Sequence, residues 1–317
     1  MPRPPQFFIY KTMGLKNFIA GMFAGPDKGM GVDELARRMK MSVDELRLVH
    51  VGYRQFTLPK KSGGQRIITA PDDKLKVLQR HILHRILGGL KSHPLATGFE
   101  RGHSIVTNAS CHVGRKVVIK LDMKDFFQST AADRVKKYFQ QIGWNRDAVD
   151  LLSHWCTYKG GLPQGAPTSP RLSNLVNHRM DARLYHLTDK KGGAYTRYAD
   201  DMTFSFMTDD PDPVNSLIGM VRKIVKEEGY DIHEHKKLQV RRRHDCQKVT
   251  GLVVNERVNL PRKTRRWLRS VEHRVVTGKV ATLSPAQLEG WISFQSMVRT
   301  QAESAAKLRR PDGSSRK

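Results

Sequence analysis

The fold of this chain is decided by residues 195–206, which read Tyr195-Thr196-Arg197-Tyr198-Ala199-Asp200-Asp201-Met202-Thr203-Phe204-Ser205-Phe206. β-Branched and aromatic residues dominate both ends of this stretch, as is typical of strands. In the second half Met202, Phe204 and Phe206 alternate with polar residues, so one face of that strand is expected to be buried. The pattern predicts a two-stranded hairpin with Ala199, Asp200 and Asp201 at its tip.

A third carboxylate stands at the end of another expected strand. Residues 117–121 form a mostly apolar, β-branched run, which predicts a buried strand that ends at Asp122. Phosphoryl transfer to a hydroxyl uses two cations close together, and Mg²⁺ prefers oxygen ligands. Two carboxylates about 4 Å apart repel by about 4 kcal/mol at an effective dielectric of 20, and bound cations would offset that cost. A pair of adjacent aspartates taken alone is more typical of a solvated turn.

The remaining pattern mixes helices with antiparallel strands, which indicates an α+β fold. The first fifty residues look helical and include a capping box at Ser42-Val43-Asp44-Glu45. A glycine turn at Ser62-Gly63-Gly64 is expected to join two short strands. We further expect helices from 71, over 131–142, from 145 to 160, after Pro170 and over 214–228, a strand over 249–254, and a partly helical tail after 260.

The charge of the chain is strongly unbalanced. It carries 56 Lys and Arg against 30 Asp and Glu, a net charge of +26, with a pI near 10.2. A compact fold with this excess repels itself, and a polyanionic partner relieves the repulsion. Binding through phosphate contacts would weaken steeply with salt.

Neither a membrane location nor a secretory route is expected. No uncharged apolar run is long enough to cross a bilayer, and the apolar residues between 15 and 23 follow the spacing of a short amphipathic helix. Cys111, Cys156 and Cys246 are far apart and form no CxxC pair, so we expect reduced thiols and no zinc knuckle. These observations predict a cytoplasmic protein.

Several motifs together resemble those of reverse transcriptases. Tyr198-Ala199-Asp200-Asp201 is similar to their YxDD box, and residues 122–127 are similar to their first palm motif. Residues 162–170, followed by Leu172-Ser173-Asn174, resemble the motif that cradles the nucleotide. Residues 60–66 resemble the fingers hairpin, and Gly229-Tyr230 with Lys236 resembles a later palm motif. The motifs occur in the order of the family and cover about residues 53–255.

The resemblance implies a right-hand polymerase fold with fingers, a palm that contains an antiparallel sheet, and a helical thumb. The expected divisions are an N-terminal helical extension at 1–52, fingers at 53–115, the catalytic palm at 116–258 and a thumb with an RNA-binding C-terminal region at 259–317. It also implies that Asp122, Asp200 and Asp201 are catalytic and bind two Mg²⁺ ions. Asp125 lies outside that set and is expected to cap a helix or be solvated.

The same resemblance implies a nucleotide-binding set, which consists of Lys60, Arg66, Phe127, Gln164, Gly165 and Lys236. Phe127 would lie beneath the incoming sugar, where a bulky ring clashes with a 2′-hydroxyl and selects deoxynucleotides. Gly165 would let the backbone approach the nascent base pair, and Arg66 with Lys60 or Lys61 would bind phosphates. The competing interpretations are a core role for Phe127, an ordinary turn at Gly165 and a solvated basic hairpin at 60–66.

Two short boxes narrow the resemblance to the reverse transcriptases of retrons. Asn108-Ala109-Ser110-Cys111-His112 resembles their NAxxH box, and Val249-Thr250-Gly251 resembles their VTG box. The resemblance implies that Asn108, His112 and residues 249–251 hold RNA, whereas an exposed loop histidine and an ordinary strand are the alternatives. A basic belt would add shape-based contacts to RNA. Its members are Lys236, Lys237, Arg241, Arg242, Arg243, Lys248, Arg257, Arg262, Lys263, Arg265, Arg266 and Arg269.

The activity implied is that of a retron RNA-directed DNA polymerase. Such an enzyme binds its cognate noncoding RNA (msr–msd), uses dNTPs, and starts DNA synthesis at the 2′-hydroxyl of an internal guanosine. Its product is branched RNA–DNA (msDNA), and the resemblance adds an effector protein and a role in defence against phage. Two alternatives stay open: another bacterial reverse transcriptase, of group II-like or diversity-generating type, and an RNA-binding scaffold or antitoxin component.

Overall fold

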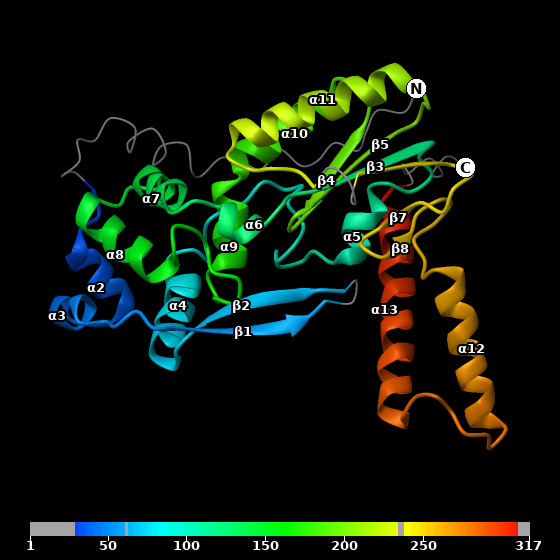
Figure 1. Cartoon of the computed structure of the whole chain (residues 1–317), viewed down its shortest axis with the longest axis horizontal. Coiled ribbons are helices and arrows are strands. Elements are labelled where there is room, and N and C mark those ends of the chain that lie inside the picture. The colour runs from blue at the N-terminus through cyan, green and yellow to red at the C-terminus, as the bar shows by residue number, and fades with distance from the viewer. Residues whose placement is uncertain (1–28, 61–62, 234–237, 310–317) are drawn as a thin grey trace, which may run out of the picture. The chain divides into compact units, whose positions relative to one another are not determined.

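The computed structural model describes residues 29–60, 63–233 and 238–309 (Figure 1). The helix expected near residues 15–23, and Lys61, Lys236 and Lys237, lie outside the described residues. The chain divides into two compact units. Unit 1 comprises residues 1–94, 123–182 and 222–231, and unit 2 comprises residues 95–122, 183–221 and 232–317.

Unit 1 contains a long antiparallel hairpin and a group of short helices. Strand β1 (Tyr53–Pro59) pairs with β2 (Gln65–Pro71), and Gly63 and Gly64 adopt positive φ in the connecting turn. The Ser42 capping box and the Asp72 cap begin their helices as the sequence predicts. The helices that lie wholly in unit 1 are α2 (Val32–Met39), α3 (Val43–Arg47), α4 (Asp73–Arg85), α6 (Phe126–Ser129), α7 (Ala132–Gln141), α8 (Arg146–Cys156) and α9 (Ser169–Val176).

Apolar faces of these helices form the core of unit 1. Leu35 of α2, Leu78 of α4, Phe139 of α7 and Leu152 of α8 are all buried in one cluster. Burying a side chain of this kind stabilises the fold by about 1.5–3 kcal/mol. The β1–β2 hairpin packs against this cluster through Tyr53.

Unit 2 is built on a four-stranded sheet with the order β4-β5-β3-β6. The strands are β3 (Val117–Asp122), β4 (Ala194–Tyr198), β5 (Asp201–Phe206) and β6 (Gln239–Arg242), and every neighbouring pair is antiparallel. Leu121 faces Met202 and Ile119 faces Phe204, so these residues share the apolar face predicted from the alternation. Asp122 and Asp201 belong to the opposite face.

Unit 2 has a hydrophobic cluster of its own, to which both its short and its long helices contribute. Helix α5 (Ile105–Ser110), the two-residue strands β7 (Lys248–Val249) and β8 (Leu252–Val253), and the helices α12 (Arg262–Val276) and α13 (Pro285–Arg309) lie together in Figure 1. Val106, Val249, Leu268 and Val298 bring buried side chains from these elements into one cluster. Helices α10 (His178–Asp189) and α11 (Pro211–Glu227) contribute residues to both units.

The mixed α+β architecture with antiparallel sheets agrees with the sequence analysis, and two local expectations were wrong. The strand expected over 249–254 is a tight hairpin, because Thr250 and Gly251 both adopt positive φ, as in the turns that suit such hairpins. The helix expected after Pro170 ends at Val176 and restarts at His178. None of the helices in the described part of the chain is long and apolar enough to span a bilayer.

Candidate active site

Two of the three predicted carboxylates are paired across the sheet of unit 2. Asp122, the last residue of β3, lies opposite Asp201, the first residue of β5. Opposed residues on antiparallel strands point to the same face, with Cβ atoms about 4.5–5.5 Å apart. Ala199 and Asp200 form the two-residue turn of the β4–β5 hairpin, since Tyr198 before it pairs with Asp201 after it. The fold therefore gathers all three aspartates at one end of the sheet.

The turn that carries Asp200 is tightly constrained. Ala199 adopts a left-handed conformation with φ of 57°, and the Arg197 guanidinium donates a hydrogen bond to the Ala199 carbonyl oxygen at 3.0 Å. A Cβ added to Gly98 would lie 2.7 Å from the Ala199 backbone nitrogen. Only glycine permits this close approach, so the segment around residue 98 supports the turn directly.

Basic side chains flank the carboxylates. Lys120 Nζ lies 3.9 Å from an Asp201 carboxylate oxygen, and His233 Nε2 lies 3.8 Å from Asp122 Oδ1. The His233 backbone N–H also donates to the Asp122 carbonyl oxygen at 3.0 Å. Neither Lys120 nor His233 was predicted from the sequence. The position of Lys120, two residues before Asp122 on the same strand face, is the signal that would have identified it.

The carboxylate edge presents oxygen donors of the kind that bind magnesium. Within the described residues, no group of three or more acidic, histidine or cysteine side chains is arranged to hold a metal ion. Asp122 and Asp201 nevertheless offer hard oxygen ligands from facing positions. Mg²⁺ is usually bound by one or two carboxylates, with waters and substrate phosphates completing its shell. The donor set at this edge fits that chemistry.

Four of the nucleotide-binding candidates lie in unit 1 around the β1–β2 hairpin and the loop before α9. Lys60 and Arg66 are exposed near the hairpin turn. The Gln164 carbonyl oxygen accepts a hydrogen bond from the Thr69 N–H at 2.7 Å, which joins the loop to β2. Gly165 has φ of 133°, and an added Cβ would lie 3.0 Å from the Thr69 carbonyl oxygen. A side chain at position 165 would therefore displace the loop.

Phe127 lies at the edge of the core of unit 1. It is half-buried and packs against the core of unit 1, while its ring lies 5.4 Å from that of Phe126. Phe126 is buried and in turn stacks on Tyr230 at 5.8 Å. Because part of the Phe127 ring is accessible, the core role does not exclude contact with a ligand.

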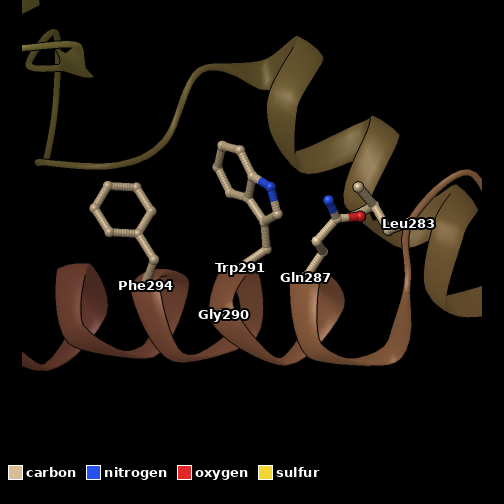
Figure 2. Close-up of a pocket in the computed structure, with 5 residues that line it drawn as sticks. All are labelled: Leu283, Gln287, Gly290, Trp291 and Phe294. Carbon is tan, nitrogen blue, oxygen red and sulfur yellow. The ribbon is translucent and has the colours of Figure 1, made fainter.

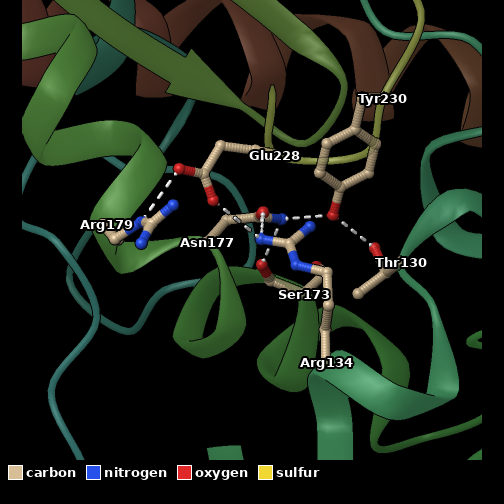
Figure 3. Close-up of polar contacts among 7 residues, drawn as sticks. All are labelled: Thr130, Arg134, Ser173, Asn177, Arg179, Glu228 and Tyr230. Atoms are coloured by element: carbon tan, nitrogen blue, oxygen red, sulfur yellow. Dashed lines mark hydrogen bonds and ion pairs between the residues drawn. The ribbon is translucent and has the colours of Figure 1, made fainter. Parts of the chain in front are cut away.

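A polar network that runs from the buried Tyr230 to the exposed Arg179 holds Tyr230 in place (Figure 3). The Tyr230 hydroxyl is 2.7 Å from Thr130 Oγ1 and accepts a hydrogen bond from Asn177 Nδ2 at 2.7 Å. Arg134 donates to Asn177 Oδ1 and lies 3.5 Å from Glu228, which also accepts from Arg179 at 3.0 Å. The break in the helix at Asn177 is thus part of this network, a role that sequence periodicity does not reveal.

Asn108 and His112, the two residues of the NAxxH box that were predicted to hold RNA, do not reach the surface. Asn108 is 1% exposed and His112 is 0% exposed. Both side chains are buried, so neither is available for direct contact with RNA in this structure. In the VTG box Val249 is buried as well, Thr250 Oγ1 donates to the Ile105 carbonyl oxygen, and Gly251 is exposed.

The predicted basic belt is largely accessible. Arg241 and Arg243 are exposed, whereas Arg242 pairs with Asp209 at 2.9 Å. On α12, Arg262, Lys263, Arg266 and Arg269 are exposed. The belt residues at positions 241 and 243 are therefore better placed to meet phosphates than Arg242.

Beside the belt, a shallow recess lies along α13 (Figure 2). Leu283, Gln287, Gly290, Trp291 and Phe294 line it, with a volume of about 340 Å³. Trp291 meets Trp267 edge to face at 5.5 Å; Trp291 is partly buried against the core of unit 2, whereas Trp267 is exposed.

Comparisons with known proteins agree with these features. The family model described as reverse transcriptase (RNA-dependent DNA polymerase) matches residues 58–268. The retron Mx65 reverse transcriptase of Myxococcus xanthus is 38% identical over 280 residues, which cover 82% of this chain and 65% of that protein. The retron Ec86 reverse transcriptase of Escherichia coli is 35% identical over 268 residues, which cover 82% of each. The chain thus spans just under two thirds of the Mx65 protein. A solved telomerase from Candida albicans has a TM-score of 0.49 at 10% identity, over 86% of this chain and 58% of that one.

Proposed function

Because the chain belongs to the reverse transcriptase family and, within it, to the reverse transcriptases of retrons, we propose that it performs RNA-directed DNA synthesis on a cognate noncoding RNA. Synthesis starts from the 2′-hydroxyl of an internal guanosine and yields branched RNA–DNA. The protein acts with an effector protein in the cytoplasm in defence against phage. The family resemblance supports these finer points.

The observation that carries the proposal is the pairing of Asp122 with Asp201 at the end of the sheet. In this proposal Asp122 and Asp200 hold Mg²⁺, and Asp201 completes or orients the cluster. When bound, Mg²⁺ activates the attacking hydroxyl and stabilises the leaving pyrophosphate. Lys120 moderates the repulsion among the carboxylates, since its ammonium lies within 4 Å of Asp201.

The nucleotide set serves the same reaction. Lys60 and Arg66 bind the triphosphate, and Lys236 lies near it by resemblance. Gln164 and Gly165 support the nascent base pair through a loop that β2 holds in place. Phe127 excludes the 2′-hydroxyl of a ribonucleotide with the accessible part of its ring.

RNA binding is assigned to the accessible basic surface of unit 2. Arg241, Arg243 and the exposed cations of α12 bind phosphates and 2′-hydroxyls of a folded RNA. Gly251, at the exposed tip of the β7–β8 hairpin, lets an RNA backbone approach closely.

The test is DNA synthesis by Asp200→Asn on the coexpressed noncoding RNA. Nucleic acid purified with the wild-type protein should contain DNA that a debranching enzyme separates from RNA. The Asp200→Asn variant should contain the RNA alone, because the lost carboxylate removes a metal ligand without removing the RNA surface. Asp125→Asn is the matched control, since Asp125 is exposed and makes no side-chain cap. Branched DNA from Asp200→Asn at the wild-type level would contradict the proposal.

A further inference from the structure

Helix α5 lies on the face of the sheet that carries the aspartates. Thr196 pairs with Thr203, and Ser205 pairs with Ala194, so Thr196 and Ser205 point to the same face as Asp201. Val106 and Ala109 of α5 pack in the same cluster as Val118, which also belongs to that face. The NAxxH box therefore covers the sheet behind the carboxylate end.

His112 links the two strands of the hairpin that ends in Asp200. Its Nδ1 lies 2.7 Å from Ser205 Oγ on β5, and its Nε2 lies 2.8 Å from Thr196 Oγ1 on β4. All three residues are completely buried. A neutral imidazole has one donor and one acceptor nitrogen, and hydroxyls can serve either. The imidazole ring thus connects the side chains of β4 and β5 and helps to hold the two strands in position.

Asn108 supports the same hairpin through the segment that lies next to its edge strand, β4. Its Oδ1 accepts a hydrogen bond from Thr97 Oγ1 at 2.8 Å, and the Thr97 N–H donates to the Arg197 carbonyl oxygen at 2.8 Å. The next residue, Gly98, closely approaches the backbone of Ala199. Asn108 therefore holds the segment that supports the turn.

The VTG box, through Thr250, also holds α5 in place. Thr250 Oγ1 donates to the Ile105 carbonyl oxygen at 2.8 Å, and Ser104 Oγ donates to Gln301 Oε1 of α13 at 2.6 Å. The β7–β8 hairpin and α13 thus fix α5, and α5 fixes the hairpin that carries Asp200.

We propose that Asn108 and His112 are positioning residues for the turn that carries Asp200 and Asp201, and that neither contacts RNA. This inference rests on the proposed function, because the turn matters only if its aspartates are catalytic. A buried hydroxyl that loses its partner shifts or admits water. Displacement of a catalytic group by about 1 Å can lower a rate by about a hundredfold.

The experiment compares His112→Leu with Thr196→Val, which removes the strand partner and leaves the histidine in place. Two quantities are measured: the dissociation constant of the noncoding RNA without dNTPs, and kcat for DNA synthesis at saturating RNA. We expect each variant to lower kcat by about ten- to a hundredfold and to leave RNA affinity within about twofold of wild type. The double variant should be no slower than the slower single variant, since both changes remove one interaction.

Thr196→Ser is the conservative control, because it retains the hydroxyl and should restore kcat. If His112→Leu does not fold, as judged by circular dichroism, the comparison of Thr196→Val with Thr196→Ser decides alone. RNA affinity weakened about tenfold or more by His112→Leu, with full kcat in Thr196→Val, would overturn the inference. A wild-type protein without DNA synthesis would instead refute the proposed function, so the two failures are distinguishable.

Discussion

Asp122 lies directly opposite Asp201 where β3 and β5 end together. The two residues are far apart in sequence, and strand register alone brings their carboxylates to one face. A shift of the register by one residue would turn one of them to the apolar face with Leu121 and Met202. The apolar pairs of the sheet therefore fix the geometry of the proposed active site.

Lys120→Ala should lower the Mg²⁺ concentration that gives half-maximal DNA synthesis by about two- to fivefold. The ammonium of Lys120 lies 3.9 Å from Asp201 and competes with a bound cation for that carboxylate. Because both side chains are partly exposed, solvent weakens the ion pair, and the expected effect is therefore small. A magnesium titration of the initial rate, with Lys120→Arg as a control that keeps the charge, measures it. An unchanged half-maximal concentration would remove Lys120 from the site.

Phe127→Ala should raise the incorporation of ribonucleotides relative to deoxynucleotides by about tenfold, in line with the selectivity that a single filled pocket gives. The accessible part of the ring is the proposed barrier to the 2′-hydroxyl. Single-nucleotide extension with matched dNTP and rNTP gives the ratio of kcat/KM values. Phe127→Tyr keeps the ring and should keep the ratio. Equal selectivity in wild type and Phe127→Ala would return Phe127 to a purely structural role.

Replacement of Arg241, Arg242 and Arg243 by Ala should weaken RNA binding and reduce its dependence on salt. Each lost phosphate contact should lower the slope of log affinity against log salt by about 0.7–0.9. Arg242 pairs with Asp209, so Arg242→Ala alone should have a smaller effect than the double replacement of Arg241 and Arg243. Filter binding at several salt concentrations gives the slopes, and identical slopes for all variants would place the RNA elsewhere.

The three thiols should differ in reactivity in the native protein. Burial raises the pKa of Cys156 to about 12, whereas Cys246 is exposed. At pH 8 the Cys156 thiol is protonated and inaccessible, whereas the exposed Cys246 can be reached by an alkylating reagent. Mass spectrometry after brief alkylation should find Cys246 modified first and Cys156 unmodified until the protein unfolds. Early modification of Cys156 would contradict the packing of unit 1.

The sheet was predictable because its sequence signals are local. The apolar run that ends at Asp122 and the alternation from Met202 to Phe206 each define a strand without reference to the rest of the chain. The family motifs then indicated which strand ends belong together. The capping box at Ser42 predicted the start of a helix, and the glycine turn at Gly63-Gly64 predicted the β1–β2 hairpin, for the same local reason.

The role of the NAxxH box was not predictable from local sequence. Helix α5 has only six residues, and polar side chains such as Asn108 and His112 suggest exposure. The burial of His112 depends on hydroxyl partners on distant strands, Thr196 and Ser205, and that of Asn108 depends on the Thr97 hydroxyl. The break at Asn177 likewise depends on Tyr230, a tertiary partner that periodicity cannot identify.

The central claim is that the aspartates gathered at the end of the sheet, Asp122 and Asp200 beside Asp201, hold divalent cations, and metal-directed cleavage of the backbone tests it most directly. Fe²⁺ with ascorbate and peroxide, added to the protein in place of Mg²⁺, should cut the chain near residue 122 and near residues 200–201. Excess Mg²⁺ should suppress both cuts, and the double variant Asp122→Asn, Asp200→Asn should lose them. Cleavage confined to other parts of the chain, or unchanged in the double variant, would contradict the account.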